Sequence, residues 1–333
     1  MFQPGRLPAG KSLLWGAMST TKKQAKKGVS FVMPVRNEEK YLAAAVDAVF
    51  EQNPAGGMEL VIAIGPSMDE TAEVTSGLKA KHGAKLIVIE NPTGGTAAGL
   101  NLAIAASKYP VVIRVDAHSE LSDGYAETAA EVLSATGAAN VGGMMVAEGE
   151  SEFQKAVAYG YNNRIGLGGG AFHVGGKTGA VETVYLGCFQ RSWLEKVGGF
   201  DPRWVRGQDW ELNKRIRESG GTVWFDPRLK VTYRPRSNWQ ALAKQFFQTG
   251  FWRGALTRQD PGSSSARYWL PPLLVLASLF GLPFSLYLLV IAFAAMNAAS
   301  LQPATRLWLM VVLPTMHFAW GLGFWWGLAR GAK

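Results

Sequence analysis

The sequence predicts an α/β fold: a mostly parallel, doubly wound sheet followed by a C-terminal pair of transmembrane helices. Three observations support this. Short apolar runs alternate with helical segments through the first 115 residues, the pattern of a parallel sheet. Asp116 and His118 follow the fourth of these runs directly. Charged residues are absent from Tyr268 to Thr305 and again from Leu307 to Ala329. The length of 333 residues suits one such domain with an appendage.

The first half of the sheet is predicted from four short, apolar segments rich in β-branched residues, which are Val29–Val35, Glu59–Ile64, Lys85–Glu90 and Val111–Val115. A helix should open at Arg36–Glu39, with Asn37 as its cap and acidic residues in its first turn. The other two helices are predicted from about Asp69 to Lys81, after the Gly65-Pro66 turn, and from the Gly94-Gly95 turn to about Ser107.

After Leu121 the predicted strands and helices no longer alternate at regular intervals. The predicted elements are a helix over Ser122–Ser134, a strand over Val141–Val146, a helix over Glu152–Tyr161, a strand over Glu182–Leu186, a turn at Gly198–Asp201, a helix over Gln208–Ser219 and a last strand over Thr222–Phe225. The glycine-rich segment Gly166–Gly179 predicts a close approach to a ligand or a mobile lid, with a flexible connector as the alternative.

Charge divides the chain into four parts, namely residues 1–27, 28–236, 237–267 and 268–330. The chain carries a net charge of +9, and residues 1–27 hold six Lys and Arg and no acid. This arm is predicted to be disordered and to contact anionic lipid, with a solubilising tail as the alternative. We find no nucleic-acid recognition motif and expect no such partner. No apolar stretch here suits a secretory signal, and Met18 is a candidate start that would leave 1–17 outside the native protein.

The two uncharged runs contain 38 and 23 residues, whereas a helix needs about 20 apolar residues to cross a bilayer. They predict two membrane-spanning helices, or three, because Pro271, Pro272 and Pro283 interrupt the first run. The alternative is a buried helical hairpin in a soluble core. Basic residues flank the pair on both sides, so we expect a multi-pass cell-membrane protein with its α/β domain in the cytoplasm. These residues are Arg253, Arg258, Arg267, Arg330 and Lys333.

Between the two parts, Asn238–Arg258 interleaves aromatic and basic residues. This pattern predicts an amphipathic helix in the membrane interface, and a core helix packed on the sheet is the alternative. Cys188 is the single cysteine, so the chain has no intramolecular disulfide and no cysteine-based metal site.

Asp116 and His118 are the first candidates for chemistry. Two residues apart at a strand end, they lie on one side of the crevice where open α/β sheets bind ligands. A carboxylate and an imidazole there suit a nucleotide diphosphate held by Mn²⁺ or Mg²⁺, with Mn²⁺ favoured by the nitrogen ligand. A lone aspartate at a strand end is otherwise structural.

Asp209 is the second candidate. It follows Gly207 at a predicted helix start, where a carboxylate is either a general base or a cap favoured by the helix dipole. Glu211 is the alternative base, and Trp210 has the ring to stack on a sugar. Arg234 and Arg236 suit pyrophosphate, because guanidinium groups match phosphate geometry, although solvated surface arginines have the same pattern.

Seven segments in order carry a family resemblance. They are Val32–Glu39, Asp69–Thr71, Asn91-Pro92 with Gly99–Asn101, Arg114–His118, the glycine-rich segment, Val197–Asp201 and Gly207–Asn213. Together, over about Val29–Arg258, they resemble the inverting family 2 glycosyltransferases of the GT-A fold. The chain is most similar to the membrane-attached succinoglycan-type branch, which elongates lipid-linked saccharides.

The resemblance implies roles for particular residues. Asp209 would be the catalytic base, and Asp116 with His118 would lie at the metal and the nucleotide. The nucleotide sugar would be bound by Pro34, Arg36, Glu38, Asp69, Asn101, Arg114 and Asp116. The acceptor or the diphosphate would contact Gln208, Trp210, Arg234, Arg236, Trp252 and Arg253.

The chain departs from the family pattern at four places. Ile64 stands where the family has an aspartate that contacts uridine, and His118 stands where the D-x-D pattern has a second aspartate. Gln208 replaces a common glutamate before the base. The Gln-x-x-Arg-Trp signature of processive synthases is absent, because Gln248 leads only to Arg253. Transfer of a single sugar is therefore favoured over chain synthesis.

The expected function is transfer of one hexose from a nucleoside diphosphate sugar, with UDP-hexose as first choice, to a lipid-linked or envelope glycan acceptor. The expected cofactor is a divalent cation, Mn²⁺ or Mg²⁺. One alternative is a polyprenyl-phosphate sugar synthase, whose acceptor is the lipid phosphate itself. The other is a non-catalytic glycan-binding subunit of the same fold, which the missing uridine aspartate favours.

Overall fold

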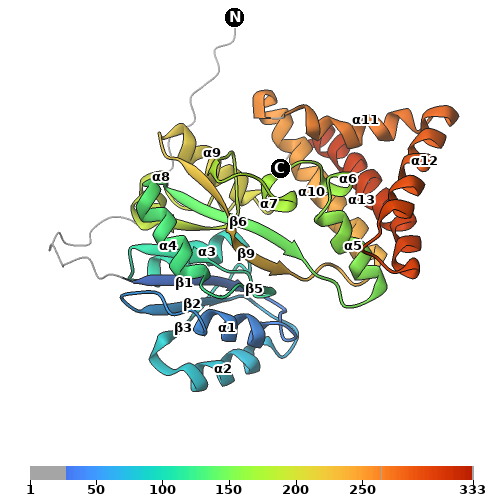
Figure 1. Ribbon diagram of the computed structural model, residues 1–333. Coiled ribbons are helices and arrows are strands. Elements are labelled where there is room, and N and C mark those ends of the chain that lie inside the picture. Colours follow the sequence, from blue (N-terminus) through green and yellow to red (C-terminus); the bar gives the residue numbers. More distant parts are fainter. Residues whose placement is uncertain (1–27, 264, 332–333) are drawn as a thin grey trace, which may run out of the picture.

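A nine-stranded sheet organises the N-terminal domain in the computed structural model, which describes residues 28–263 and 265–331 (Figure 1). The basic arm predicted over 1–27 lies outside the described residues. The strands are β1 Val29–Val35, β2 Met58–Ile64, β3 Leu86–Glu90, β4 Val111–Arg114, β5 Ser119–Leu121, β6 Asn140–Ala147, β7 Gly179–Ala180, β8 Tyr185–Gln190 and β9 Val223–Tyr233.

The helices cover both faces of this sheet and then form a layer of their own. Those of the α/β domain are α1 Leu42–Phe50, α2 Thr71–His82, α3 Thr96–Ala106, α4 Tyr125–Thr136, α5 Glu152–Tyr161, α6 Arg164–Leu167, α7 Ala171–Val174, α8 Arg191–Val197 and α9 Gln208–Glu218. The C-terminal layer contains α10 Trp239–Gln259, α11 Leu270–Ala277, α12 Gly281–Asn297 and α13 Pro303–Arg330. Single 3₁₀ turns lie at Gly83–Lys85, Pro261–Ser263 and Ala266–Trp269.

The sheet runs in the order β3-β2-β1-β4-β8-β6-β9-β5, with β7 paired to β9. Its first four strands are parallel, as expected. Beyond β4 the pairing is mixed, because β8 lies antiparallel between β4 and β6 while β6 and β9 are parallel. The order reverses between β1 and β4, and such a switch point opens a crevice at the carboxyl ends of the strands.

Burial on both faces explains why the first strands are continuous apolar runs. Along β1, Phe31 and Met33 enter the core beneath α1, α2 and α4, while Val32 enters the core beneath α3, α8 and α9. Along β2, Leu60 and Val61 divide in the same way. The alternation of side chains across a strand therefore builds one core on each side of the sheet.

The helix expected at Arg36–Glu39 begins later, at Leu42, and Asn37 is not its cap. Asn37 has φ +54° and its side chain accepts a hydrogen bond from the Met68 backbone N–H at 2.9 Å. The backbone N–H of Glu38 donates to Thr71 Oγ1 at 2.7 Å. Hydrogen bonds with Met68 and Thr71 therefore hold this segment against the chain that follows β2, and it stays irregular until the helix begins at Leu42.

Two predicted strands are displaced or too short. The strand expected at Glu182–Leu186 is β8, shifted to Tyr185–Gln190, because its pairing with β4 and β6 sets its position. The strand expected at Thr222–Phe225 continues to Tyr233 as β9, past Pro227. The register with β6 shifts next to this proline, which local propensity alone does not reveal. The short strands β5 and β7 and the helix α8 were not predicted.

The helix expected over Asn238–Arg258 is α10, and its main partner is α13 rather than the sheet. Four glycines make the contact, namely Gly250 and Gly254 of α10 with Gly323 and Gly327 of α13. A Cβ at Gly254 would lie 2.0 Å from the Phe324 carbonyl oxygen, and one at Gly323 would lie 2.0 Å from that of Phe247. The two backbones therefore touch, as in small-residue helix pairs of membrane proteins.

The two predicted membrane-spanning helices are not supported. Among the described residues one helix, α13, is long and apolar enough to cross a bilayer. The first uncharged run divides into α11, with 8 residues, and α12, with 17. Pro271 and Pro272 occupy the first turn of α11 and Pro283 that of α12, positions where the missing N–H costs nothing. Proline placement therefore replaces one long helix by two short ones.

The α10–α13 contact predicts opposite effects for one substitution at two helical glycines. Gly254→Ala should lower the free energy of unfolding by about 1–3 kcal/mol, because the methyl group meets backbone that must move. Gly77→Ala on α2, where a Cβ meets nothing within 4 Å, should raise it by about 0.5–1 kcal/mol. Thermal unfolding of the detergent-solubilised variants measures both, and equal shifts would contradict the contact.

Candidate active site

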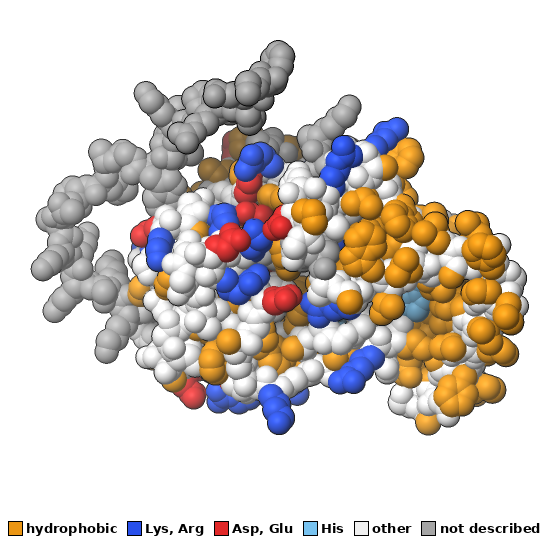
Figure 2. All heavy atoms as spheres, turned by 90° about the horizontal axis from the view of Figure 1, so that it is seen from above, with side chains coloured by type: hydrophobic (Ala, Val, Ile, Leu, Met, Phe, Trp, Pro, Cys, Tyr) orange, Lys and Arg blue, Asp and Glu red, His pale blue; other side chains and the backbone are white. Residues whose placement is uncertain are grey.

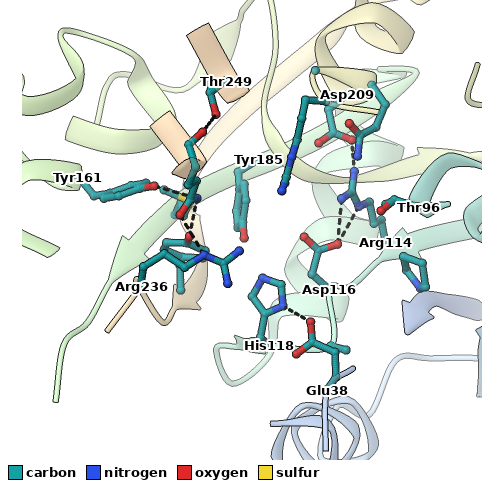
Figure 3. A pocket seen from close by; sticks show the side chains of 18 of the residues that line it. Glu38, Thr96, Arg114, Asp116, His118, Tyr161, Tyr185, Asp209, Arg236 and Thr249 are labelled. Atoms are coloured by element: carbon teal, nitrogen blue, oxygen red, sulfur yellow. Dashed lines mark hydrogen bonds and ion pairs between the residues drawn. The ribbon is translucent and has the colours of Figure 1, made fainter. Parts of the chain in front are cut away.

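A cavity of about 440 Å³ opens at the carboxyl ends of β1 and β4, at the switch point of the sheet. Pro34, Arg36 and Glu38 line it from the β1 side, and Arg114, Asp116 and His118 line it from β4 and the segment that follows. Gln208 and Asp209 enter from the start of α9. Figure 3 shows these side chains converging on one space from three separate parts of the chain.

Arg114 connects the two carboxylates that the sequence singles out. The side chain is 5% exposed, and its Nε and Nη2 donate to Asp116 Oδ1 at 3.1 and 2.9 Å. Its Nη1 donates to Asp209 Oδ1 (Figure 3). A buried guanidinium is stable only when its charge is compensated, and these two acids supply the compensation. Asp116 and Asp209 are thereby held on opposite sides of one group.

The same arrangement sets the protonation of the two acids apart. Burial alone would raise the pKa of Asp116, but the charges of Arg114, His118 and Arg206 outweigh it and lower that pKa. Burial raises the pKa of Asp209, and the negative charge of Asp116 adds to this, so that Arg114 offsets the rise only in part. Asp116 therefore stays ionised to lower pH than Asp209, and Asp209 is the more basic of the two carboxylates.

His118 is oriented by Glu38, whose Oε1 lies 2.9 Å from the imidazole Nδ1. A carboxylate only accepts hydrogen bonds, so Nδ1 carries the proton and donates, which leaves Nε2 on the other side of the ring. Burial works against protonation of His118, but the hydrogen bond to Glu38 and the charge of Asp116 prevail and raise its pKa. Both hydrogen bonds from Arg114 to Asp116 use Oδ1, so Oδ2 is available to a ligand.

A polar wall that sequence reasoning missed faces this group. Gln245 of α10 donates from Nε2 to the hydroxyls of Tyr161 at 3.1 Å and Tyr233 at 2.9 Å. Its Oε1 accepts from Arg236 Nε at 3.1 Å. Tyr185, which is hydrogen-bonded to Ser119 at 3.3 Å, stands next to Asp116 (Figure 3). Helix α10 therefore contributes directly to the cavity.

The glycine-rich segment, which the sequence predicted to approach a ligand or to act as a mobile lid, contributes side chains to the cavity wall. It forms α6 and α7, and Leu167, Phe172 and His173 from it line the cavity. Burial lowers the pKa of His173 to about 3, with a smaller effect from Arg267, so this imidazole is neutral. Arg206 also lines the cavity, and its position just before Gly207 is a signal that could have identified it.

Two predicted nucleotide-sugar residues lie outside the cavity. Asp69 accepts hydrogen bonds from the Thr71 hydroxyl at 2.6 Å and the Glu39 backbone N–H at 3.3 Å, and so joins two loops. Asn101 exchanges two hydrogen bonds with the backbone of Phe200, at 2.7 and 2.9 Å, and so ties α3 to the Gly198–Asp201 turn. Both side chains are therefore engaged in hydrogen bonds that join segments of the domain.

The residues predicted to contact the acceptor or the diphosphate are also divided. Gln208 and Arg236 line the cavity. Arg234 instead lies 3.4 Å from each of Glu120 and Glu148. Arg253 is a buried residue of α10, with its guanidinium 3.6 Å from the centre of the Tyr268 ring and 5.0 Å from that of Trp210.

Trp252 lines a neighbouring hollow rather than the main cavity. This hollow, of about 920 Å³, shares Arg36, Gly94, Thr96 and Arg206 with the cavity. Its apolar side consists of Phe247, Phe251 and Trp252 of α10 with Trp326 of α13. The main cavity therefore continues into an aromatic surface formed by the C-terminal helices.

A metal ion would find only part of its coordination in the protein. Among the described residues no group of three or more His, Cys, Asp or Glu side chains is arranged to hold a metal. Asp116 Oδ2 and His118 Nε2 are two ligand atoms that the hydrogen bonds within the described part of the chain leave available. An oxygen with an imidazole nitrogen fits Mn²⁺ or Mg²⁺ if a ligand supplies the remaining oxygens.

Comparison with known proteins identifies a matching family model and two similar proteins. A family model described as "Glycosyl transferase family 2" matches residues 30–198. The succinoglycan biosynthesis protein ExoA of Rhizobium meliloti (strain 1021) is 29% identical over 310 residues, which cover 88% of this chain and 93% of that protein. A dolichyl N-acetyl-alpha-D-glucosaminyl phosphate 3-beta-D-2,3-diacetamido-2,3-dideoxy-beta-D-glucuronosyltransferase of Methanococcus voltae is 25% identical over 320 residues, 91% of this chain and 98% of that one.

Two solved structures share the fold. The mannosyltransferase PcManGT from Pyrobaculum calidifontis, in complex with GDP-Man and Mn²⁺, has a TM-score of 0.58 and 18% identity, and the match covers 87% of this chain and 85% of that chain. TarS residues 1–349 from S. aureus, in complex with UDP, has a TM-score of 0.51 and 13% identity, over 88% and 90% of the two chains.

The position of Arg114 predicts a large loss of stability when its charge is removed. Arg114→Met should lower the free energy of unfolding by about 3–5 kcal/mol, because it leaves two carboxylates without their shared partner. Arg203→Met, which removes the largely exposed ion pair with Asp201, should cost less than about 1 kcal/mol. Chemical denaturation of both variants measures the difference, and similar losses would show that Arg114 has no special role in the fold.

Proposed function

This chain belongs to glycosyl transferase family 2 and is a glycosyltransferase of the GT-A fold, and from that premise we propose a specific reaction for it. The enzyme transfers one hexose from a nucleoside diphosphate sugar to a lipid-linked or cell-envelope glycan, with inversion at the anomeric carbon. It acts at the cytoplasmic face of the cell membrane, to which its C-terminal helices attach it.

The observation that carries this proposal is the buried Arg114 between Asp116 and Asp209. It separates two carboxylates with different protonation inside one cavity, and such a division is typical of acid–base sites. Asp209, whose pKa burial raises, is the better base. Asp116, whose charge is maintained by Arg114, suits the diphosphate end of the donor.

Asp209 is proposed to act on the acceptor hydroxyl. The carboxylate takes the hydroxyl proton while the acceptor oxygen forms a bond to the anomeric carbon from the face opposite the diphosphate. The bond between that carbon and the phosphate oxygen breaks, and the electron pair leaves with the nucleoside diphosphate. Gln208 lies beside Asp209 in the cavity wall, where it is placed to orient the acceptor.

Asp116 and His118 are proposed to hold a divalent cation together with the donor diphosphate. Glu38 accepts a hydrogen bond from Nδ1 of the imidazole, which leaves the lone pair of Nε2 for a metal ion and so supports this role. When bound, the cation supplies positive charge to the departing diphosphate. Arg206 and Arg236, both in the cavity wall, add to that charge. Mn²⁺ binds alongside GDP-Man in the archaeal mannosyltransferase of the same fold.

The donor is proposed to be a UDP-hexose, with GDP and dTDP sugars as alternatives. Structural neighbours bind either UDP-GlcNAc or GDP-Man, so the fold accommodates both bases. Pro34, Arg36 and Glu38 at the end of β1 border the part of the cavity where the nucleotide would lie.

The acceptor is proposed to be a lipid-linked saccharide. Two relatives carry names that indicate polysaccharide or dolichyl-linked glycan synthesis. The aromatic hollow beside the cavity, which includes Trp252 and Trp326, provides an apolar surface for the lipid part of such an acceptor. Arg36 and Arg206 lie where the hollow meets the cavity, and their charges suit the phosphate that joins lipid to sugar.

A donor panel tests the reaction. Detergent-purified protein with Mn²⁺, Mg²⁺ or EDTA should release one nucleotide from UDP-, GDP- or dTDP-sugars, only with metal and faster with membrane lipid extract. Analysis of the product separates a lengthened lipid-linked saccharide from a polyprenyl phosphate that has received its first sugar. Absence of both turnover and nucleotide binding would favour a non-catalytic, glycan-binding role.

Asp209→Asn should reduce transfer by about 10²–10⁴-fold, because the amide cannot accept the acceptor proton. Donor affinity should change little, since the proposed action of Asp209 is on the acceptor. Glu218→Gln, an exposed acid at the end of the same helix, is the matched control and should keep full activity. If Asp209→Asn transferred at the original rate while Asp116→Ala did not, the base would be another residue.

A further inference from the structure

Helix α13 is long enough to cross a bilayer, yet it lies against the α/β domain and α10 along its whole length. We infer that α11, α12 and the outer side of α13 enter a single leaflet of the membrane, parallel to its plane, and that none of the described helices crosses it. This inference rests on the membrane attachment in the proposed function and specifies its form.

The first end of α13 is held by α5. Thr305 Oγ1 donates a hydrogen bond to Glu152 Oε2, and Glu152 also pairs with Lys155 at 2.7 Å. One turn further, the rings of Trp308 and Phe153 pack edge to face with centroids 5.4 Å apart. This end of α13 therefore lies beside charged residues of the catalytic domain.

The middle and the C-terminal end of α13 also contact neighbouring elements. His317 Nε2 lies 2.8 Å from the Ile165 carbonyl oxygen, and Gly160 makes room for Met316. Gly323 and Gly327 then contact the α10 backbone at Phe247 and Phe251. At the last turn, Arg258 of α10 donates from Nη1 to the carbonyl oxygens of Leu328, at 3.2 Å, and Ala329.

These contacts conflict with a membrane-spanning α13. Its 28 residues extend over about 42 Å, more than the roughly 30 Å of the hydrocarbon core. One end of α13 is bonded to α5 of the α/β domain and the other to α10, so crossing the bilayer would carry α5 and α10 with it. Lys155 lies on α5 between the contacts that Glu152 and Gly160 make with α13. Lys244 lies on α10, one turn before the contact of Phe247 with α13. Both lysines would then lie at membrane depth, which is strongly unfavourable for charged side chains.

The face turned away from the domain has the chemistry of a lipid-embedded surface. The exposed large apolar residues of α11, α12 and their linker are Leu270, Leu273, Leu276, Leu279, Phe280, Leu282, Phe284, Leu286, Leu288, Leu289, Val290, Phe293 and Met296. Leu307, Trp308, Met310, Val311, Leu322 and Trp326 extend the surface along α13. Figure 2 shows these side chains gathered at one end of the molecule. A patch of this size without charge fits acyl chains, not water.

The turn between α12 and α13 supports the same orientation. Arg306 is the only charged residue from Tyr268 to Ala329, and it donates to the carbonyl oxygens of Leu301 at 3.0 Å, Met296 at 3.3 Å and Ala299 at 3.3 Å. In a two-span arrangement this basic turn would face away from the cytoplasm, against the usual distribution of positive charge. In the single-leaflet arrangement it stays on the side of the catalytic domain.

Accessibility of cysteines at both ends of α13 tests the inference. Cys188 is fully buried and is the only native cysteine, so the background is low. Ser300→Cys, in the turn before α13, and Ala329→Cys, in its last turn, are exposed reporters, and Ser76→Cys on α2 is the cytoplasmic control. A membrane-impermeant maleimide is added to spheroplasts and to inverted membrane vesicles of a bacterial host, before and after detergent.

All three cysteines should be labelled in inverted vesicles at similar rates, and none in spheroplasts beyond the unsubstituted chain. Labelling of Ser300→Cys or Ala329→Cys in spheroplasts would overturn the inference, because a spanning α13 must place one end on the far side. If Ser300→Cys were labelled neither in spheroplasts nor in inverted vesicles, that result would also overturn the inference. Sugar transfer by the same vesicles confirms that the variants are folded. Protein that is released by alkaline carbonate would instead contradict the membrane attachment itself.

Discussion

The ion pairs of Arg114 with Asp116 and Asp209 are the contacts on which the site depends. They join the end of β4 to the start of α9, which are 95 residues apart in the sequence. All three charged groups lie in a cavity where they are only partly exposed to water. A guanidinium so deeply buried is stable only with both partners in place, and the carboxylates would repel each other without it. One side chain therefore links the two acids and contributes to the difference in their pKa values.

The second constraint is the glycine contact between α10 and α13. Because the two backbones touch at Gly250, Gly254, Gly323 and Gly327, α10 and α13 form one unit of the C-terminal layer. Helix α10 also carries Gln245, which bonds Tyr161 and Tyr233 in the cavity wall. One helix thus separates the apolar layer from the polar site, which is the arrangement that the proposed lipid-linked acceptor requires.

Much of the α/β domain follows from local sequence. The first four strands and the helices α2, α3, α5 and α9 lie where apolar runs, turns and caps predicted them, because each pattern is local and both sheet faces are covered. Asp116, His118 and Asp209 were identifiable because their positions at a strand end and a helix start already suggest chemistry. The pairing of β8 and the length of β9 were not, because partners far along the chain set them.

The sequence by itself therefore determined the fold class and the family, and it named Asp116 and Asp209, which line one cavity, since these depend on local periodicity and on short motifs. Only the tertiary structure decided which candidates share the cavity. Asp69 joins two loops, Asn101 joins α3 to a turn, and Trp210 and Arg253 do not line the cavity, because hydrogen-bond partners and packing direct a side chain more strongly than its position in a motif. It also gave α13 contacts at both of its ends, which hydropathy cannot reveal because it counts apolar residues and not their neighbours.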